Sequence, residues 1–173
     1  MRNTESLEII SEVLENERRE VVLFRRLADT VRSPLGKAVF KDYAEKGKTL
    51  CTRVEALRGA IVKGPDGTAE ARTFSTVADY DELDDDEGRL SRSIEDALAG
   101  FDDLTAIDVA VRFVRKTTRI LARSCSLIRD PAHREALRAI ETAERENFMH
   151  LKNIEEYLKD PHSWFREMEH HHM

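Results

Sequence analysis

Residues 4–31 read TESLEIISEVLENERREVVLFRRLADTV, and this stretch decides the fold. Apolar side chains return along it in alternating steps of three and four residues, which is the spacing of a helix face packed inside a bundle. One position of this face is a glutamate, Glu17, although its neighbours are apolar. The stretch therefore predicts a long core-facing helix whose buried side is made of Leu7, Ile10, Leu14, Glu17, Val21, Phe24, Ala28 and Val31.

The same step pattern predicts three further long helices, at about residues 34–61, 103–129 and 131–158. Two dipeptides separate neighbouring helices, Ser33-Pro34 and Asp130-Pro131. The residue before a proline avoids the helical conformation, whereas proline suits the first turn of a new helix. Because each link is only a few residues long, the helices that it joins must pack as an antiparallel hairpin.

The two hairpins match each other at a constant offset of 97 positions, without a gap. Residues 101–128 read FDDLTAIDVAVRFVRKTTRILARSCSLI, so that Leu104 falls on Leu7 and Leu121 on Phe24. An internal repeat of this length indicates a duplicated unit. We therefore predict an all-α, ferritin-like four-helix bundle made of two duplicated antiparallel helical hairpins joined by a long crossover. Its parts in a single domain 1–173 are a hairpin 5–61, a crossover with a short helix 62–102, a hairpin 103–158 and a C-terminal tail 159–173.

Composition excludes several classes of function. The net charge is −6 and both signs are interspersed, with no basic stripe, so we expect no nucleic-acid partner. No apolar run approaches the roughly 20 residues of a membrane span, and the N-terminus lacks the pattern of a secretory signal. The two cysteines, Cys51 and Cys125, have no metal or redox spacing and suit a reducing compartment. We expect a cytoplasmic protein without membrane contact.

Polar and small residues interrupt the apolar faces near the middle of each predicted helix. When the helices are aligned by their faces, these positions fall in the same central layers of the bundle. Di-iron bundles place their ligands there: one Glu on each of two helices, and Glu-x-x-His on each of the other two. The corresponding positions in this chain are Glu17, Gly47, Leu50, Val114, Glu144 and Asn147.

Two stretches resemble a known family. ENERREVVLFRRLADTVRSPLGKAVFKDYAEKGKTL at residues 15–50 and HLKNIEEYLKDPHSWFREMEH at residues 150–170 are similar to the rubrerythrin-like branch of the ferritin-like superfamily. The resemblance extends over about residues 5–169 and implies a ferritin-like bundle with a central two-iron site. The rubredoxin-like Cys₄ site of that family is absent, because the chain has only two cysteines.

The ligand positions depart from that pattern. Only Glu17 and Glu144 keep a carboxylate, whereas Leu50 and Asn147 replace both histidines. We therefore predict a degenerate di-iron site in which two residual glutamates are protonated, hydrogen-bonded, paired with a cation or bound to one divalent metal ion. Asn147, Thr118 and the arginines at positions 18, 115 and 145 are the candidate partners. Gly47 could instead open a small-ligand pocket.

A second alignment of the helices, shifted by three residues, stays open at this point. It places Asn147-x-x-His150 in the Glu-x-x-His position and Thr117 in a Glu position. Neither alignment completes a two-iron site. The favoured hypothesis is therefore a non-catalytic scaffold or interaction protein that needs no cofactor and acts as a homodimer or with a protein partner. The alternative is an iron-dependent oxidoreductase or iron-handling protein that holds one Fe, Mn or Zn ion at Glu17 and Glu144.

Overall fold

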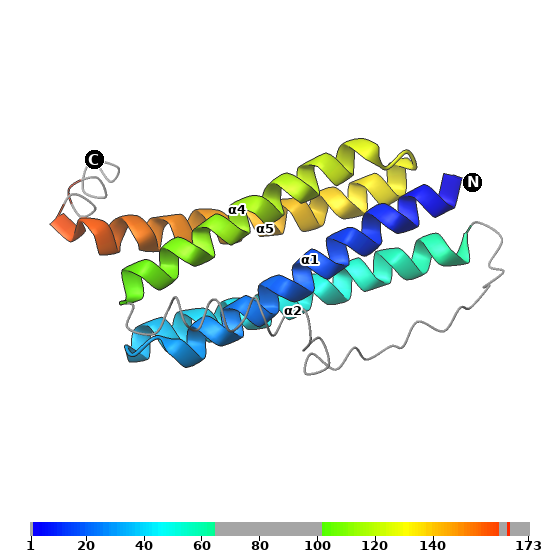
Figure 1. Ribbon diagram of the computed structural model, residues 1–173. Coiled ribbons are helices and arrows are strands. Elements are labelled where there is room, and N and C mark those ends of the chain that lie inside the picture. Colours follow the sequence, from blue (N-terminus) through cyan, green and yellow to red (C-terminus); the bar gives the residue numbers. More distant parts are fainter. Residues whose placement is uncertain (1, 65–101, 163–165, 167–173) are drawn as a thin grey trace.

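The structure, a computed structural model, describes residues 2–64, 102–162 and 166. The described residues form four long α-helices in two hairpins, which confirms the predicted bundle (Figure 1). None of these helices carries an apolar stretch long enough to cross a membrane. The helices are α1 (Arg2–Thr30), α2 (Pro34–Lys63), α4 (Asp103–Leu127) and α5 (Pro131–Lys159).

Equivalent caps start the second helix of each hairpin. The Ser33 hydroxyl accepts a hydrogen bond from the Gly36 amide at 2.9 Å, and the Asp130 carboxylate accepts one from the His133 amide at 2.9 Å. Each cap precedes a proline and has an extended backbone, so it satisfies an amide that the first turn leaves free. Both caps and both amides are 97 positions apart, in agreement with the predicted duplication.

The helices pack in the cyclic order α1, α2, α5, α4. Helix α1 packs against α2 and α4, and α5 packs against the other sides of α2 and α4. The first residue of α4, Asp103, accepts a hydrogen bond from the Ser33 hydroxyl in the α1–α2 turn. Helix α4 therefore starts where α1 ends and runs antiparallel to it (Figure 1). Because α2 also runs antiparallel to α1, it ends at the opposite end of the bundle from the start of α4, as the predicted crossover requires.

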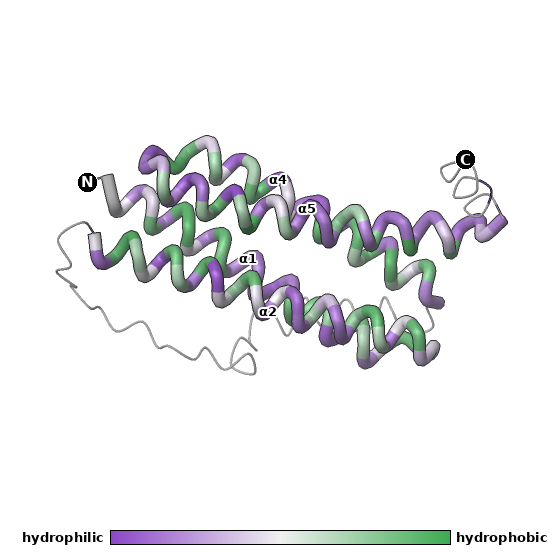
Figure 2. The backbone as a smooth tube through the Cα atoms, turned by 180° about the vertical axis from the view of Figure 1, so that it is seen from behind, coloured by the Kyte–Doolittle hydropathy of each residue, from purple (hydrophilic) through white to green (hydrophobic). Residues whose placement is uncertain are grey.

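Apolar positions recur along all four helices (Figure 2). Their buried side chains form two separate core clusters. One cluster lies toward the α1–α2 turn and the other toward the α4–α5 turn. Between them, α1, α4 and α5 contribute a layer of buried polar side chains. The first cluster includes Phe24, Val31, Phe40, Tyr43, Ile107 and Val114, and the second includes Ile10, Leu14, Leu50, Leu121, Ile128 and Leu137.

The helix bounds lie within two residues of the predicted ones. Asp102 caps α4, because its carboxylate accepts a hydrogen bond from the Thr105 amide at 3.0 Å. The predicted short helix within residues 62–102 and most of the C-terminal tail lie outside the described residues.

Candidate metal centre

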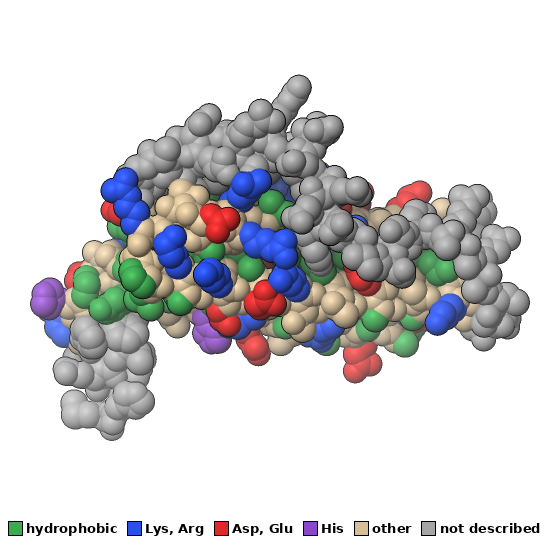
Figure 3. Space-filling view, turned by 90° about the horizontal axis from the view of Figure 1, so that it is seen from below, with side chains coloured by type: hydrophobic (Ala, Val, Ile, Leu, Met, Phe, Trp, Pro, Cys, Tyr) green, Lys and Arg blue, Asp and Glu red, His purple; other side chains and the backbone are tan. Residues whose placement is uncertain are grey.

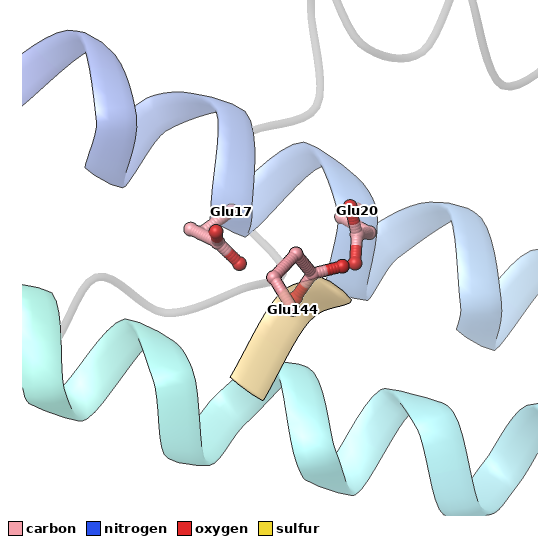
Figure 4. Close-up of side chains that lie close together, drawn as sticks. All are labelled: Glu17, Glu20 and Glu144. Carbon is pink, nitrogen blue, oxygen red and sulfur yellow. The ribbon is translucent and has the colours of Figure 1, made fainter. Parts of the chain in front are cut away.

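Three glutamates meet in the polar layer at the centre of the bundle. Glu17 and Glu20 lie one turn apart on α1, and Glu144 reaches them from α5 (Figure 4). Their exposed fractions are 0%, 1% and 0%. Each offers a carboxylate oxygen, and these three oxygens lie within 4.8 Å of one another. The fold thus gathers three acidic side chains into one small volume that water does not reach.

A chain of hydrogen bonds holds Glu20 in place. The buried Thr117 hydroxyl of α4 donates to Oε2 of Glu20 at 2.5 Å. The Asn16 amide in turn donates to the Thr117 hydroxyl oxygen at 2.8 Å. One side of the cluster is therefore a satisfied polar network that links α1 to α4.

Glu17 and Glu144 lack such support. None of their four carboxylate oxygens has a hydrogen-bond partner among the described residues. Glu20 and Asn147 lie close enough to Glu144 to lower its pKa, but a contact between two carboxyl groups is a hydrogen bond only when one carries a proton. Glu17 thus has no donor, and the contacts of Glu144 with Glu20 and with the Asn147 amide do not reach the geometry of a normal hydrogen bond, which is costly for two buried carboxylates unless a proton or a metal ion is present.

Burial raises the pKa of all three glutamates above the ordinary value of 4.5. The charge of Glu144 raises the pKa of Glu17 further. The charges of Glu144 and Glu17 act on the pKa of Glu20 in the same direction, and the Thr117 hydroxyl partly offsets them. In the metal-free protein the three groups therefore share protons, because three neighbouring carboxylates cannot all ionise in a dry core.

The arginines that were candidate partners of the cluster are engaged elsewhere. Arg18 pairs with Glu55 at 3.0 Å, and Arg145 pairs with Glu141 on its own helix. The Arg115 guanidinium lies over the Phe148 ring, 5.6 Å from its centroid. No lysine or arginine in the described part of the chain forms an ion pair with the three glutamates. Pairing of the cluster with Arg18, Arg115 or Arg145 is therefore wrong.

Thr118 was also an incorrect candidate. Its hydroxyl donates to the Arg115 carbonyl oxygen at 2.8 Å, whereas the preceding Thr117 points into the core. The alternation of steps predicts Thr118 on the buried face, because it lies four residues after Val114 and three before Leu121. Helix α4 instead buries Val114, Thr117 and Leu121, a step of three followed by one of four.

The other predicted central positions provide packing rather than ligands. Leu50 and Val114 are buried in the two apolar clusters. A Cβ atom at Gly47 would lie 2.8 Å from Cγ2 of Val21, so the space beside this glycine is filled and does not open the pocket we considered. The Asn147 side chain is half-buried, and the backbone carbonyl oxygen of Asn147 accepts a long hydrogen bond from the Tyr43 hydroxyl at 3.5 Å.

These residues do not fit the two iron ions that the family resemblance implies. Two metal ions need ligands from all four helices, but α2 offers Gly47 and Leu50, and α4 offers Val114. His150 is exposed on α5, so the second alignment fails to supply an imidazole. The orphaned oxygens of Glu17 and Glu144, together with Glu20, do fit one divalent cation.

Glu20 is the site residue that the sequence analysis missed. Glu20 lies beside the apolar face that runs through Glu17 and Val21. If only a narrow face were buried, the Glu20 side chain would be half-exposed. A helix in a four-helix core buries a wider stripe, so positions three apart both point inward. The spacing Glu17-x-x-Glu20 was the available signal.

Comparison with known proteins gives no relative: no protein-family model, no curated protein and no solved structure matches this chain. The four-helix fold and the buried three-glutamate cluster are therefore established without a family assignment.

Proposed function

We propose that this protein binds one divalent cation, manganese(II) or iron(II), through Glu17, Glu20 and Glu144. The observation that carries this proposal is that both carboxyl groups of the Glu17–Glu144 pair are fully buried and unpartnered. A divalent ion between them would supply the positive charge and the coordination that no described side chain provides. It would also explain why a bundle core keeps three carboxylates.

The ligand chemistry favours particular metals. All three groups donate carboxylate oxygen, and neither a histidine nor a cysteine belongs to the cluster. Oxygen-only sites suit manganese and other hard cations, whereas zinc is usually held by imidazole or thiolate. We therefore place manganese(II) first and iron(II) second, and zinc behind both.

In this proposal the chain is a ferritin-like bundle of the rubrerythrin-like kind whose two-metal site has been reduced to one metal. The support is the duplicated hairpin and the position of Glu17 and Glu144 in the central layer. The activity that we propose is metal binding, without the two-metal chemistry for which α2 and α4 lack ligands. Homodimer formation and a protein partner remain predictions for solution measurements.

A second candidate is the non-catalytic scaffold, in which the cluster stays protonated and acts only in folding. The hydrogen-bonded chain from Asn16 through Thr117 to Glu20 favours it, because this part of the network is satisfied without metal. The two candidates differ in one property. In the scaffold the protonated glutamates bind no cation. In the metal site the glutamates must release their protons when the cation binds.

Equilibrium dialysis against Mn²⁺, followed by elemental analysis, separates the two candidates. We expect close to one Mn²⁺ per chain at pH 8 and weaker binding at pH 6, since protons compete for the glutamates. The variant Glu144→Gln should lose the ion, whereas Glu146→Gln, an exposed glutamate on the same helix, should retain it. Absence of Mn²⁺ and Fe²⁺ from the wild-type protein would favour the scaffold.

A further inference from the structure

A pocket of about 420 Å³ lies between α1 and α4, next to the glutamate cluster. Asn16 and Ser124 line it and are only 6% and 7% exposed, whereas the charged side chains around them are exposed. Other lining residues are Glu12, Arg19, Lys116 and Arg123. The pocket thus leads from a charged rim to an inner wall of buried polar groups.

Asn16 separates this pocket from the metal centre. Its side chain lines the pocket and also donates to Thr117, which donates to Glu20. Asn16 also directly precedes Glu17 in α1. A single amide side chain therefore lies at the boundary between the pocket and the cluster, whose three glutamates are themselves inaccessible to water.

We infer that the metal ion enters through this pocket and that Asn16, held by Thr117, is the gate. The inference rests on the proposed function, because it concerns the route to that site. An ion can reach the glutamates only if side chains move. Rotation of Asn16 breaks one hydrogen bond to the Thr117 hydroxyl and leaves the apolar clusters on either side in place.

The charged side chains at the pocket rim offer a test of the entry route, because they lie at the surface and can be replaced. Glu15 pairs with Arg19 at 2.6 Å. Lys116 and Arg123 have no acidic partner among the described residues, and Lys116 lies near the Phe113 ring. Arg19, Lys116 and Arg123 outnumber Glu12 and Glu15 among the lining residues, so the rim carries a net positive charge that slows the approach of a bare divalent ion. Removing the charges of Lys116 and Arg123 should speed entry if the ion passes this rim. If the ion enters by another route, the rate should not change.

Rapid mixing with Co²⁺, followed through its visible absorption, measures the rate of entry. We expect the double variant K116Q/R123Q to load at least about threefold faster than wild type at low salt, with a smaller difference at high salt. The matched control R112Q/R119Q removes the same charge from the same helix outside the pocket and should load at the wild-type rate.

A second variant tests the gate itself. Asn16→Ala removes the amide while keeping a strong helix former, and should speed Co²⁺ entry by about fivefold. Wild-type rates in both Asn16→Ala and K116Q/R123Q, with one Co²⁺ bound at equilibrium, would overturn the entry route and leave the metal site standing. Absence of bound Co²⁺ at equilibrium would overturn the proposed function as well.

Discussion

The Thr117 hydroxyl donates to Oε2 of Glu20 at 2.5 Å, and the two residues are 97 positions apart. This separation is the offset that superposes the two hairpins, so equivalent positions of the repeat meet where α1 and α4 pack together. One copy keeps a carboxylate there and the other a hydroxyl. The duplicated halves have thus diverged into an acceptor and its donor.

Loss of this donor should destabilise the protein. Thr117→Val keeps the shape of the side chain but leaves the Asn16 amide and the Glu20 carboxyl group without their shared partner. We expect a loss of about 1–3 kcal/mol in the free energy of unfolding, measured by urea denaturation. Thr118→Val is the control, because the Thr118 hydroxyl is bonded to its own helix at the surface and its loss should change stability by less than about 0.5 kcal/mol.

The stability of the metal-free protein should decrease as the pH rises above 4.5. The glutamates of the cluster have raised pKa values in the folded state, so they keep protons that the unfolded chain releases. Their contribution to stability is complete below the unfolded pKa and is lost as the pH rises through the folded pKa. Each retained proton contributes a slope of about 1.4 kcal/mol per pH unit.

Urea denaturation in a chelating buffer between pH 5 and pH 8 checks this slope. The variant E17Q/E144Q should have a flatter profile than wild type, because glutamine does not titrate. The control E8Q/E146Q changes two exposed glutamates on the same helices and should keep the wild-type slope. Equal slopes in wild type and E17Q/E144Q would contradict shared protons in the cluster.

Replacing a glutamate of the unpartnered pair by an apolar residue should stabilise the metal-free fold. Glu17→Leu removes a buried carboxyl group whose oxygens have no partner, and the apolar side chain can pack between the two core clusters. Such replacements of buried charged groups stabilise by about 1–4 kcal/mol in favourable cases. We expect a higher thermal midpoint without metal and no further rise on addition of Mn²⁺. A lower midpoint in chelator would indicate that the carboxyl group has an essential structural partner.

The close approach of α1 and α2 at the centre depends on Gly47. Alanine normally stabilises a helix relative to glycine by about 1 kcal/mol, but at this position its Cβ would lie 2.8 Å from Cγ2 of Val21. We expect Gly47→Ala to destabilise by about 1–3 kcal/mol, the usual cost of overpacking. Val21→Ala should relieve the clash, so that the double variant is more stable than additivity of the single variants allows.

Gly59 on the same helix is the matched control for this prediction. A Cβ atom at Gly59 would meet no other atom within 4 Å, so Gly59→Ala should stabilise by about 0.5–1 kcal/mol. Equal effects of alanine at the two positions in thermal unfolding would show that the contact with Val21 does not limit the packing of the two helices.

Most of the fold could be predicted from the sequence, because long helices show a regular spacing of apolar residues and are separated here by dipeptides that end in proline. The apolar face through Leu7, Ile10 and Leu14 and the Ser33-Pro34 dipeptide indicate α1 and the start of α2, and the structure agrees on both. The offset of 97 then predicts the second hairpin. The short helix predicted between the hairpins lies outside the described residues.

The site could be predicted only in part. Glu17 and Glu144 fall on the apolar faces of their helices and are found in the cluster. Whether a side chain next to such a face is buried depends on how wide a stripe of the helix its neighbours cover. Sequence spacing alone could not decide that Glu20 and Thr117 turn inward while Thr118 turns outward. Sequence spacing also could not show that Arg18, Arg115 and Arg145 interact with other residues, because the partner of a long side chain depends on the local geometry.

The most direct test of the central claim is an anomalous-diffraction map at the manganese absorption edge, from crystals grown with Mn²⁺. We predict a single strong peak in the core of each chain, enclosed by the carboxylates of Glu17, Glu20 and Glu144. A map with no peak between these three side chains, or with two peaks there, would contradict a site for one metal ion.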